Sequence, residues 1–244
     1  MAIWEQPDLY SGLSLEAKEE KKKAELALCI PHQNIISMEW ALAFRHLRLP
    51  PYLYFFNKGM PIDVAREQMV RSALKHDIKY IFFLDSDIVL NDPDGVLKLI
   101  EISKQFNLPV VSGLYFAKKR DVIQPAAWKI VERKGNDVKL APVANIEEHI
   151  KKNHVIEVDA IGLGLAVIRR DVFDKLEEKD PGKPFFEWGL GRQNLPQVSE
   201  DFFFCLKLLD NLNIHPHVAT IVRAHHICMA RRNRDNGKLE LTQI

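Results

Sequence analysis

Short apolar runs alternate with helix-like segments along the first half of the chain, and this alternation restricts the folds that it can adopt. The runs are AELALCI (24–30), YLYFFN (52–57), KYIFFLD (79–85) and PVVSGLYF (109–116). Continuous apolar runs of this length are typical of strands buried on both faces of a parallel sheet. Helical patterns lie between them, over 36–47, 61–75 and 92–106. The repeated strand–helix order predicts an open α/β sheet.

The second half of the chain is mixed. Residues 128–143 suggest a hairpin that turns at 134–137, and residues 155–170 predict a strand pair or one long bent strand. Helices are expected over 171–179 and 199–211, and a last strand over 217–225. We expect one domain over 24–228, with a mixed, mainly parallel sheet flanked by helices. A charged arm (1–23) precedes it and a basic tail (229–244) follows it.

Composition and charge exclude several classes of protein. The chain has 244 residues, of which 47% are hydrophobic and 27% charged, and its formal net charge is only +1. This is the composition of a folded globular protein, and it offers no basic field for nucleic acid. Three scattered cysteines form no disulfide framework. Since no signal peptide or long apolar span is found, we expect a cytoplasmic protein without a transmembrane segment, and peripheral membrane contact stays open.

Asp85-Ser86-Asp87 follows the strongest strand signal in the chain, within the segment IFFLDSD. In open α/β sheets ligands bind beyond the carboxyl ends of the strands, because loops and helix N-termini meet there. Two carboxylates separated by one residue offer the oxygen ligands that Mg²⁺ or Mn²⁺ prefers. The alternative interpretation is that these aspartates only end a strand and begin a turn.

Two further segments carry side chains that could serve in catalysis or metal binding. Glu200 and Asp201 lie in the first turn of a predicted helix after Ser199, where the helix dipole also favours acidic residues for purely structural reasons. Phe202 stands where a capping box would have Glu or Gln, which leaves a carboxylate for general-base catalysis. His225 and His226 end the last strand, and since neighbouring strand residues point to opposite faces, only one faces the crevice.

Taken in order, these segments resemble the GT-A glycosyltransferases, in particular the family 2-like enzymes. The resemblance runs from about Ala24 to His226 through LALCIPHQN, DVAREQMV, IFFLDSD, VDAIGLGLAVIRRDVF, FFEWGLGRQNLPQVSEDFFFC and RAHHIC. It implies a GT-A (Rossmann-like) fold, with a nucleotide-binding half over 24–116 and an acceptor and catalytic half over 117–228. It also implies a nucleotide-sugar donor, a Mn²⁺ or Mg²⁺ ion, and a carbohydrate, lipid-linked or protein acceptor.

The resemblance assigns roles residue by residue. IFFLDSD matches the DxD motif, which makes Asp87 the direct metal ligand and Asp85 a contact on the nucleotide side that also approaches the metal. RAHHIC favours His226 over His225 as the distant metal ligand. Asp201 matches the catalytic base of inverting members, with Glu200 beside it. The remaining expected contacts are to the nucleotide (Pro31, Gln33, Asn34, Arg66 and Ser86) and to the donor sugar or acceptor (Gly162, Gly164 and Trp188).

Structural alternatives stand beside these roles. Gly162 and Gly164 equally suit a bulge or close packing, and Trp188 equally suits the core. FFLDSDIVL also fits a Mg²⁺-dependent phosphatase of the haloacid dehalogenase type, although that motif normally lies on the first strand of its domain. A non-catalytic carbohydrate- or nucleotide-binding protein is the third hypothesis. A nucleic-acid module built on MARRNRDNGK is disfavoured, because the basic stretch is short and lacks aromatic residues.

Overall fold

The computed structural model describes residues 23–32, 36–119, 122–135, 137–188, 198–232 and 239–243. Its helices are α1 (Met38–His46), α2 (Ile62–Ala73), α3 (Gly95–Gln105), α4 (Ile146–Lys152), α5 (Arg170–Lys179) and α6 (Glu200–Leu212). The strands of the central sheet are β1 (Leu26–His32), β2 (Tyr52–Lys58), β3 (Tyr80–Leu84), β4 (Ile88–Leu90), β5 (Val110–Leu114), β10 (Val155–Glu157), β12 (Leu165–Arg169) and β13 (His217–His226). The remaining strands are β6 (Phe116–Lys119), β7 (Val122–Pro125), β8 (Ala127–Lys134), β9 (Asp137–Pro142), β11 (Ala160–Ile161), β14 (Cys228–Arg232) and β15 (Leu239–Gln243).

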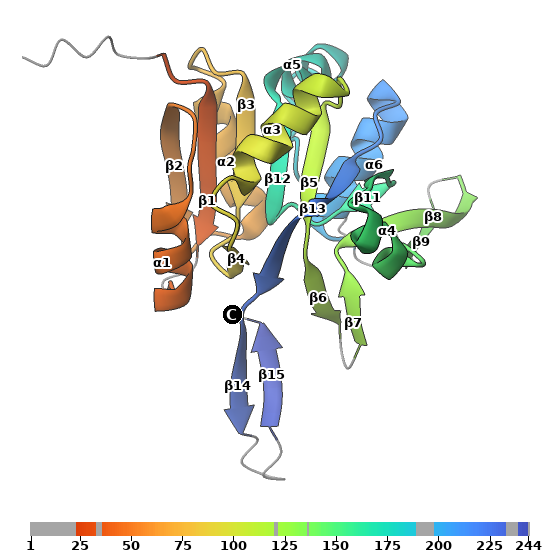
Figure 1. Ribbon diagram of the computed structural model, residues 1–244. Helices are drawn as coiled ribbons and strands as arrows, with labels where there is room; N and C mark the ends of the chain where they lie inside the picture. Colours follow the sequence, from red (N-terminus) through yellow and green to blue (C-terminus); the bar gives the residue numbers. More distant parts are fainter. Residues whose placement is uncertain are drawn as a thin grey trace, which may run out of the picture.

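The central sheet confirms the predicted mixed, mainly parallel α/β architecture. Its strand order is β10-β13-β5-β12-β3-β1-β2, and the short strand β4 pairs with β13 beside this path. Strands β2, β1, β3, β5 and β13 run in one direction, whereas β12 is antiparallel to both β3 and β5 and β10 is antiparallel to β13. The carboxyl ends of β1, β3 and β5 therefore meet at one edge of the sheet (Figure 1).

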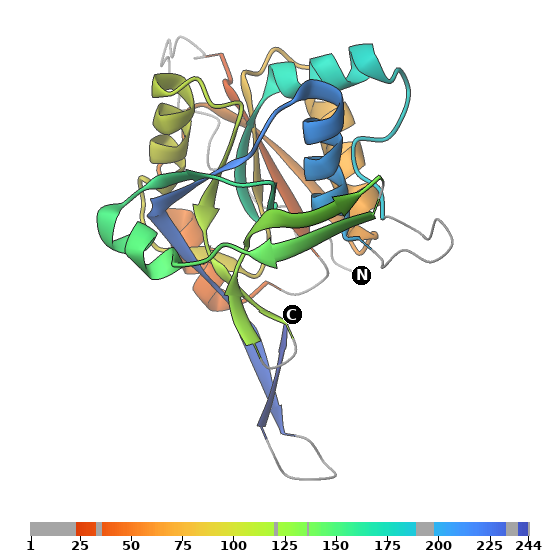
Figure 2. The same cartoon turned by 90° about the vertical axis from the view of Figure 1, so that its right-hand side faces the viewer.

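Helices cover the sheet on both faces. α1 and α3 lie on one face and α2, α5 and α6 on the other, as the two views show (Figures 1 and 2). Between these layers the apolar runs predicted from the sequence are almost fully buried, with Leu26, Leu28, Phe82 and Phe83 at 0% exposure. Strands buried on both faces need apolar side chains on both faces, which is why these runs do not alternate with polar residues.

The second half of the chain departs from the prediction in two places. Residues 155–170 form neither a strand pair nor one bent strand, because β10 and β12 belong to the central sheet while β11 pairs with β8. The chain changes sheets around Gly162 and Gly164, where small residues allow close packing. Where the sequence suggests only a basic tail, β14 and β15 form an antiparallel hairpin that projects from the domain next to the β6–β7 hairpin (Figure 1).

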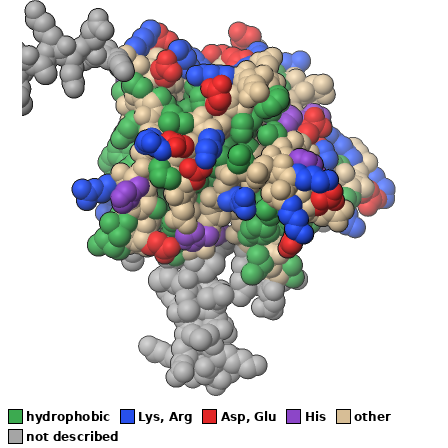
Figure 3. Space-filling model, in the orientation of Figure 1, with side chains coloured by type: hydrophobic (Ala, Val, Ile, Leu, Met, Phe, Trp, Pro, Cys, Tyr) green, Lys and Arg blue, Asp and Glu red, His purple; other side chains and the backbone are tan. Residues whose placement is uncertain are grey.

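The three-stranded sheet β11-β8-β9 lies on the side of α6, and β8 and β9 form the hairpin predicted over 128–143 (Figure 2). On the surface, basic and acidic side chains are interspersed over the face shown in Figure 3, in keeping with the small net charge. Among the described residues, no helix combines the length and the apolar character that spanning a bilayer requires.

Candidate active site

The turn Asp85–Asp87 joins β3 to β4 and is held by bonds from three directions. The Asp85 backbone N–H donates to the carbonyl of Gly164 (3.0 Å), and the Asp85 carbonyl accepts hydrogen bonds from the Ile88 N–H (3.1 Å) and the Trp40 indole N–H (3.0 Å). The turn lies where β3 ends, at the edge of the sheet that open α/β proteins use for ligands. Its two carboxylates are thus fixed in place by backbone geometry.

Asp87 and His226 meet across this edge although they lie far apart in the sequence. The Nε2 atom of His226 is 2.9 Å from Oδ2 of Asp87, and the Ile227 N–H donates to the Asp87 carbonyl (2.7 Å). Pairing of β4 with β13 places His226 opposite Ile88 and so sets this approach. His225 turns away, with its Nε2 atom 2.7 Å from Oε1 of Glu39. Of the two histidines, the structure brings His226 to the site.

Arg66 of α2 lies beneath the turn as a buried clamp. The guanidinium is paired with Glu200, and its Nη2 atom donates to both carboxylate oxygens of Asp85 (2.9 and 3.0 Å). Only 2% of Arg66 is exposed, and its guanidinium lies over the Phe83 ring at 5.6 Å. The sequence predicts that Arg66 contacts the nucleotide, and the structure places its guanidinium against the carboxylates of Asp85 and Glu200.

Burial dominates the electrostatics of these acidic groups. Burial raises the pKa of Glu200 to about 7, with Arg66 acting in the opposite direction. Burial likewise raises the pKa values of Asp85 and Asp201, again against the pull of the Arg66 charge. For Arg66 itself, burial lowers the pKa but the charges of Asp85 and Glu200 outweigh it, so the guanidinium stays charged. One cation therefore holds a cluster of acids together.

Asp201 opens helix α6 and uses one of its oxygens there. Oδ1 accepts hydrogen bonds from the Ser199 hydroxyl and from the Phe202 N–H (2.8 Å). This is the structural role that the helix start alone would explain. Among the described residues, Oδ2 of Asp201 accepts no hydrogen bond, which leaves one oxygen to take a proton. Glu200, by contrast, is 4% exposed and paired with Arg66.

Gly162 and Gly164 pack against side chains of the site. A Cβ atom on Gly162 would collide with the Tyr115 hydroxyl, and one on Gly164 would lie 2.8 Å from Oδ2 of Asp85. The Gly164 N–H donates to the Tyr115 hydroxyl (3.3 Å), and the Tyr115 ring meets the His226 ring edge-on, with centroids 5.9 Å apart. The close-packing interpretation thus accounts for both glycines. Tyr115 was missed in the sequence, although it directly follows the apolar core of strand β5.

A cavity of about 450 Å³ opens at this turn. Its lining includes the expected residues Pro31, Asp85, Ser86, Asp87 and Trp188, together with His32, Asn57, Met60, Pro61, Ile62 and Ala65. Trp188, expected at the sugar or acceptor, lines the same cavity as the two aspartates. The His32 ring stacks with Phe56 (centroids 6.0 Å apart, 27° between planes), and His32 was also missed, although it ends strand β1. Gln33 and Asn34 lie outside the described residues.

The side chains at this turn could provide part of the coordination of a divalent metal ion, with phosphate oxygens and water as the other ligands. Among the described residues, no group of three or more His, Cys, Asp or Glu side chains is arranged to hold a metal alone. Asp87 and His226 offer one carboxylate and one imidazole, while Arg66 occupies the oxygens of Asp85. Mg²⁺ and Mn²⁺ commonly take one or two protein ligands and fill their other positions with water and phosphate oxygens. The residues present suit that arrangement.

Comparisons with known proteins bear on the fold. No protein-family model matches the chain, and a search of curated proteins finds no match. Among solved structures, A197 from STIV matches with a TM-score of 0.52 at 17% identity, covering 90% of this chain and 95% of that one. CMP:2-keto-3-deoxy-manno-octonic acid synthetase complexed with CTP matches with a TM-score of 0.44 at 14% identity, covering 83% and 90%. The likeness to A197 shows a shared α/β fold over nearly the whole chain.

Proposed function

We propose that the protein is a metal-dependent glycosyltransferase of the GT-A type, which moves a sugar from a nucleoside-diphosphate sugar to an acceptor hydroxyl. The observation that carries the proposal is the convergence of two separate pairs on one cavity. Asp87 lies against His226, and Asp85 is held by Arg66, both at the carboxyl edge of the sheet. A cavity of about 450 Å³ falls within the range of small-molecule sites.

On the donor side, Asp87 and His226 would hold Mn²⁺ or Mg²⁺. The ion supplies positive charge to the diphosphate as it leaves. Asp85 serves the nucleotide side, and its carboxylate is oriented by Arg66 before any ligand arrives. Pro31, Ser86 and Trp188 line the same cavity and bound the donor. A pre-oriented site loses less entropy when the donor binds.

On the acceptor side, Asp201 is the proposed base. The acceptor oxygen attacks the anomeric carbon, the bond from that carbon to the diphosphate oxygen breaks, and the acceptor proton passes to Asp201. The raised pKa of Asp201 suits this role, because a base works best when its pKa approaches the working pH. Direct attack inverts the anomeric configuration. Glu200 is then a positioning residue, since it contacts Arg66 in the buried cluster.

The phosphatase alternative requires Asp85 to act as a nucleophile. A nucleophilic aspartate must present a free oxygen to phosphorus. In this structure both Asp85 oxygens accept hydrogen bonds from Nη2 of Arg66. The arrangement therefore favours a carboxylate that orients a ligand over one that forms a covalent bond.

Thermal unfolding with nucleotides tests the donor site. A nucleoside diphosphate (UDP or GDP) at about 100 times its Kd stabilises by about 2.7 kcal/mol, which is about 5–10 °C in Tm for a domain of this size. We expect this shift only with MnCl₂ or MgCl₂ present, and its loss in Asp87→Asn. Asp174→Asn is the matched control, because Asp174 is half exposed and, among the described residues, its one ion pair is with Arg170 on α5. A shift that does not need the metal would contradict the proposal.

The base is tested by turnover. Asp201→Asn should slow transfer or donor hydrolysis by about 10²–10⁴-fold, the usual contribution of a positioned base. The metal-dependent nucleotide shift should persist in this variant. If the wild type binds nucleotide with metal but neither it nor the variant turns over any UDP- or GDP-sugar, the protein is a binding protein and the enzyme proposal fails.

A further inference from the structure

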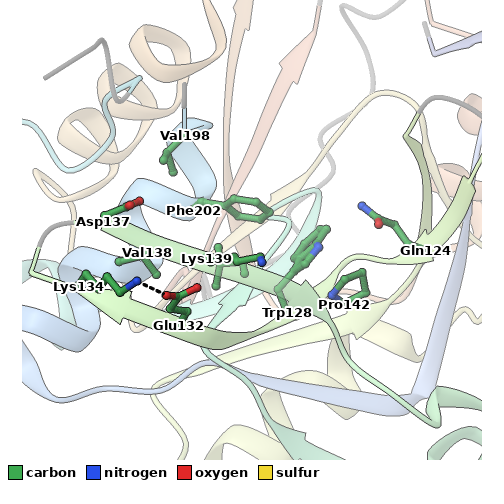
Figure 4. A pocket seen from close by; sticks show the side chains of 11 residues that line it. Gln124, Trp128, Glu132, Lys134, Asp137, Val138, Lys139, Pro142, Val198 and Phe202 are labelled. Carbon is green, nitrogen blue, oxygen red and sulfur yellow. Dashed lines mark ion pairs between the residues drawn. The ribbon is translucent and has the colours of Figure 1, made fainter. Parts of the chain in front are cut away.

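A second cavity, of about 580 Å³, lies between the β8–β9 hairpin and the start of α6 (Figure 4). Its lining comes from the β7–β8–β9 segment and from the residues that lead into α6. These residues are Gln124, Trp128, Glu132, Lys134, Asp137, Val138, Lys139, Leu140, Pro142, Val198 and Phe202. It shares none of them with the cavity at Asp85–Asp87. No step of the proposed donor chemistry uses it.

Two aromatic side chains form the apolar wall of this cavity. The Trp128 and Phe202 rings are 4.5 Å apart at 69°, an edge-to-face contact that fixes both orientations. Trp128 is 9% exposed and Phe202 only partly buried, so the pair presents a small and rigid apolar surface to the cavity. Pro142, opposite Trp128 in the hairpin, extends that surface. These apolar side chains suit contact with the C–H groups of a sugar ring.

Polar groups surround this wall. Glu132 and Lys134 form an ion pair (2.6 Å) and neutralise each other. Among the described residues, neither the Lys139 ammonium nor the Asp137 carboxylate has an ion-pair partner, and Figure 4 shows Lys139 reaching toward the two rings. The Gln124 amide lies on the far side of Trp128 in the same view. An ammonium, a carboxylate and an amide together can donate hydrogen bonds to several hydroxyl groups and accept hydrogen bonds from them.

The cavity adjoins the proposed reaction centre through shared elements. Phe202 directly follows Asp201, and its N–H donates to Oδ1 of that residue. On the other wall, the Ala126 N–H donates to the Tyr115 carbonyl (2.9 Å), two residues before Trp128. Tyr115 in turn contacts Gly164 beside Asp85. A molecule held against the Trp128–Phe202 pair therefore lies next to the first turn of α6, which also contains Asp201.

We propose that this cavity binds a carbohydrate acceptor. One sugar ring packs on Trp128 and Phe202, and its hydroxyl groups bond to Lys139, Asp137 and Gln124, so that the acceptor hydroxyl is directed toward Asp201. This inference rests on the proposed glycosyl transfer and names its acceptor class. It also assigns to Trp128 the platform that the sequence suggested for Trp188, which lies on the donor side.

The test is ligand-observed saturation-transfer NMR with a panel of methyl glycosides: neutral hexosides, N-acetylhexosaminides and a glucuronide. We expect at least one member to bind wild type at millimolar concentration. Lys139→Gln and Gln124→Ala should weaken that binding at least tenfold, and Trp128→Phe should weaken it as well. The first two side chains are exposed or half-buried, so these variants keep the fold even if Trp128→Phe does not. Lys151→Gln, an exposed lysine on α4, is the matched control.

The outcomes separate this inference from the proposed function. Absence of binding by the whole panel, or binding that Lys139→Gln and Gln124→Ala leave unchanged, would overturn the acceptor site. A loss confined to the glucuronide in Lys139→Gln would support it and identify an acidic acceptor. The metal-dependent UDP or GDP shift of wild type is measured separately, so that failure of donor binding with glycoside binding intact rejects the transferase and not the carbohydrate site.

Discussion

Replacement of Arg66 by methionine tests the buried clamp directly. The Arg66 side chain is 3% exposed, and its partners Glu200 and Asp85 are 6% and 25% exposed. Removal of one member of a buried ion pair costs about 3–5 kcal/mol, because the other charge is left without a partner. Arg66 holds two carboxylates, so we expect a loss at the upper end of that range at pH 8.

Arg71→Met is the matched control on the same helix. Arg71 also pairs with two carboxylates, those of Glu67 and Glu177, but it is 34% exposed and Glu177 is 40% exposed. Pairs in contact with water contribute about 0–1 kcal/mol. Arg66→Met should therefore be less stable than Arg71→Met by roughly 3–5 kcal/mol. Urea unfolding followed by circular dichroism measures both values.

The loss in Arg66→Met should depend on pH. Without the guanidinium the pKa values of Glu200 and Asp85 rise further, because Arg66 lowers both in the wild type. The folded variant then holds protons that the folded wild type releases, and its deficit shrinks as the pH falls from 8 toward 5.5, by about 1.4 kcal/mol for each unit of added pKa shift. A deficit that is equal at both pH values, or equal to that of Arg71→Met, would refute the clamp.

Three further predictions follow from single features. The folded-state pKa of Glu200, about 7, lies above its ordinary value of 4.5. The contribution of Glu200 to the free energy of unfolding should therefore fall as the pH rises from about 4.5 to about 7. Urea titrations should show a smaller fall in Glu200→Gln. Gly162→Ala should lower the free energy of unfolding by about 1–3 kcal/mol, because the added Cβ meets the Tyr115 hydroxyl. Thermal unfolding should show that Tyr115→Phe in the same chain recovers part of that loss. Additive losses from the two substitutions would contradict the contact. Burial raises the thiol pKa of Cys29 and Cys205, so mass spectrometry should find both unlabelled by iodoacetamide at pH 8 until urea unfolds the protein.

The sequence predicts those parts of the structure that local patterns encode. Apolar runs such as 79–85 mark buried strands because full burial leaves no polar face. Apart from the short strand β4, the order of strands and helices through β5 follows from them. The rule that ligands gather at the carboxyl ends of strands directs attention to Asp85 and Asp87, and both line a cavity at this edge of the sheet. The same rule also covers His32 and Tyr115, which end or follow strands.

Other parts depend on contacts between distant segments, which no local pattern carries. The partners of Arg66 lie 19 and 134 residues away, so the sequence shows a cation on a helix but not the acids that it meets. Trp188 illustrates the same limit, because only the folded chain shows that it lines the cavity at Asp85–Asp87. A two-residue strand such as β11 and a helix as short as α4 are too brief for periodicity to reveal.

The position of β12 determines when the central sheet can be completed during synthesis on the ribosome. β12 lies between β3 and β5, so β5 cannot join the group formed by β3, β1 and β2 until residues 165–169 have been synthesised. The last strand, β13, then completes the pair of Asp87 with His226. A nascent chain that ends before β13 lacks His226, the partner of Asp87, so the proposed metal-dependent nucleotide binding should require synthesis through residue 226. Nascent chains arrested before residue 226 should bind nucleotide with metal far more weakly than chains arrested well after it.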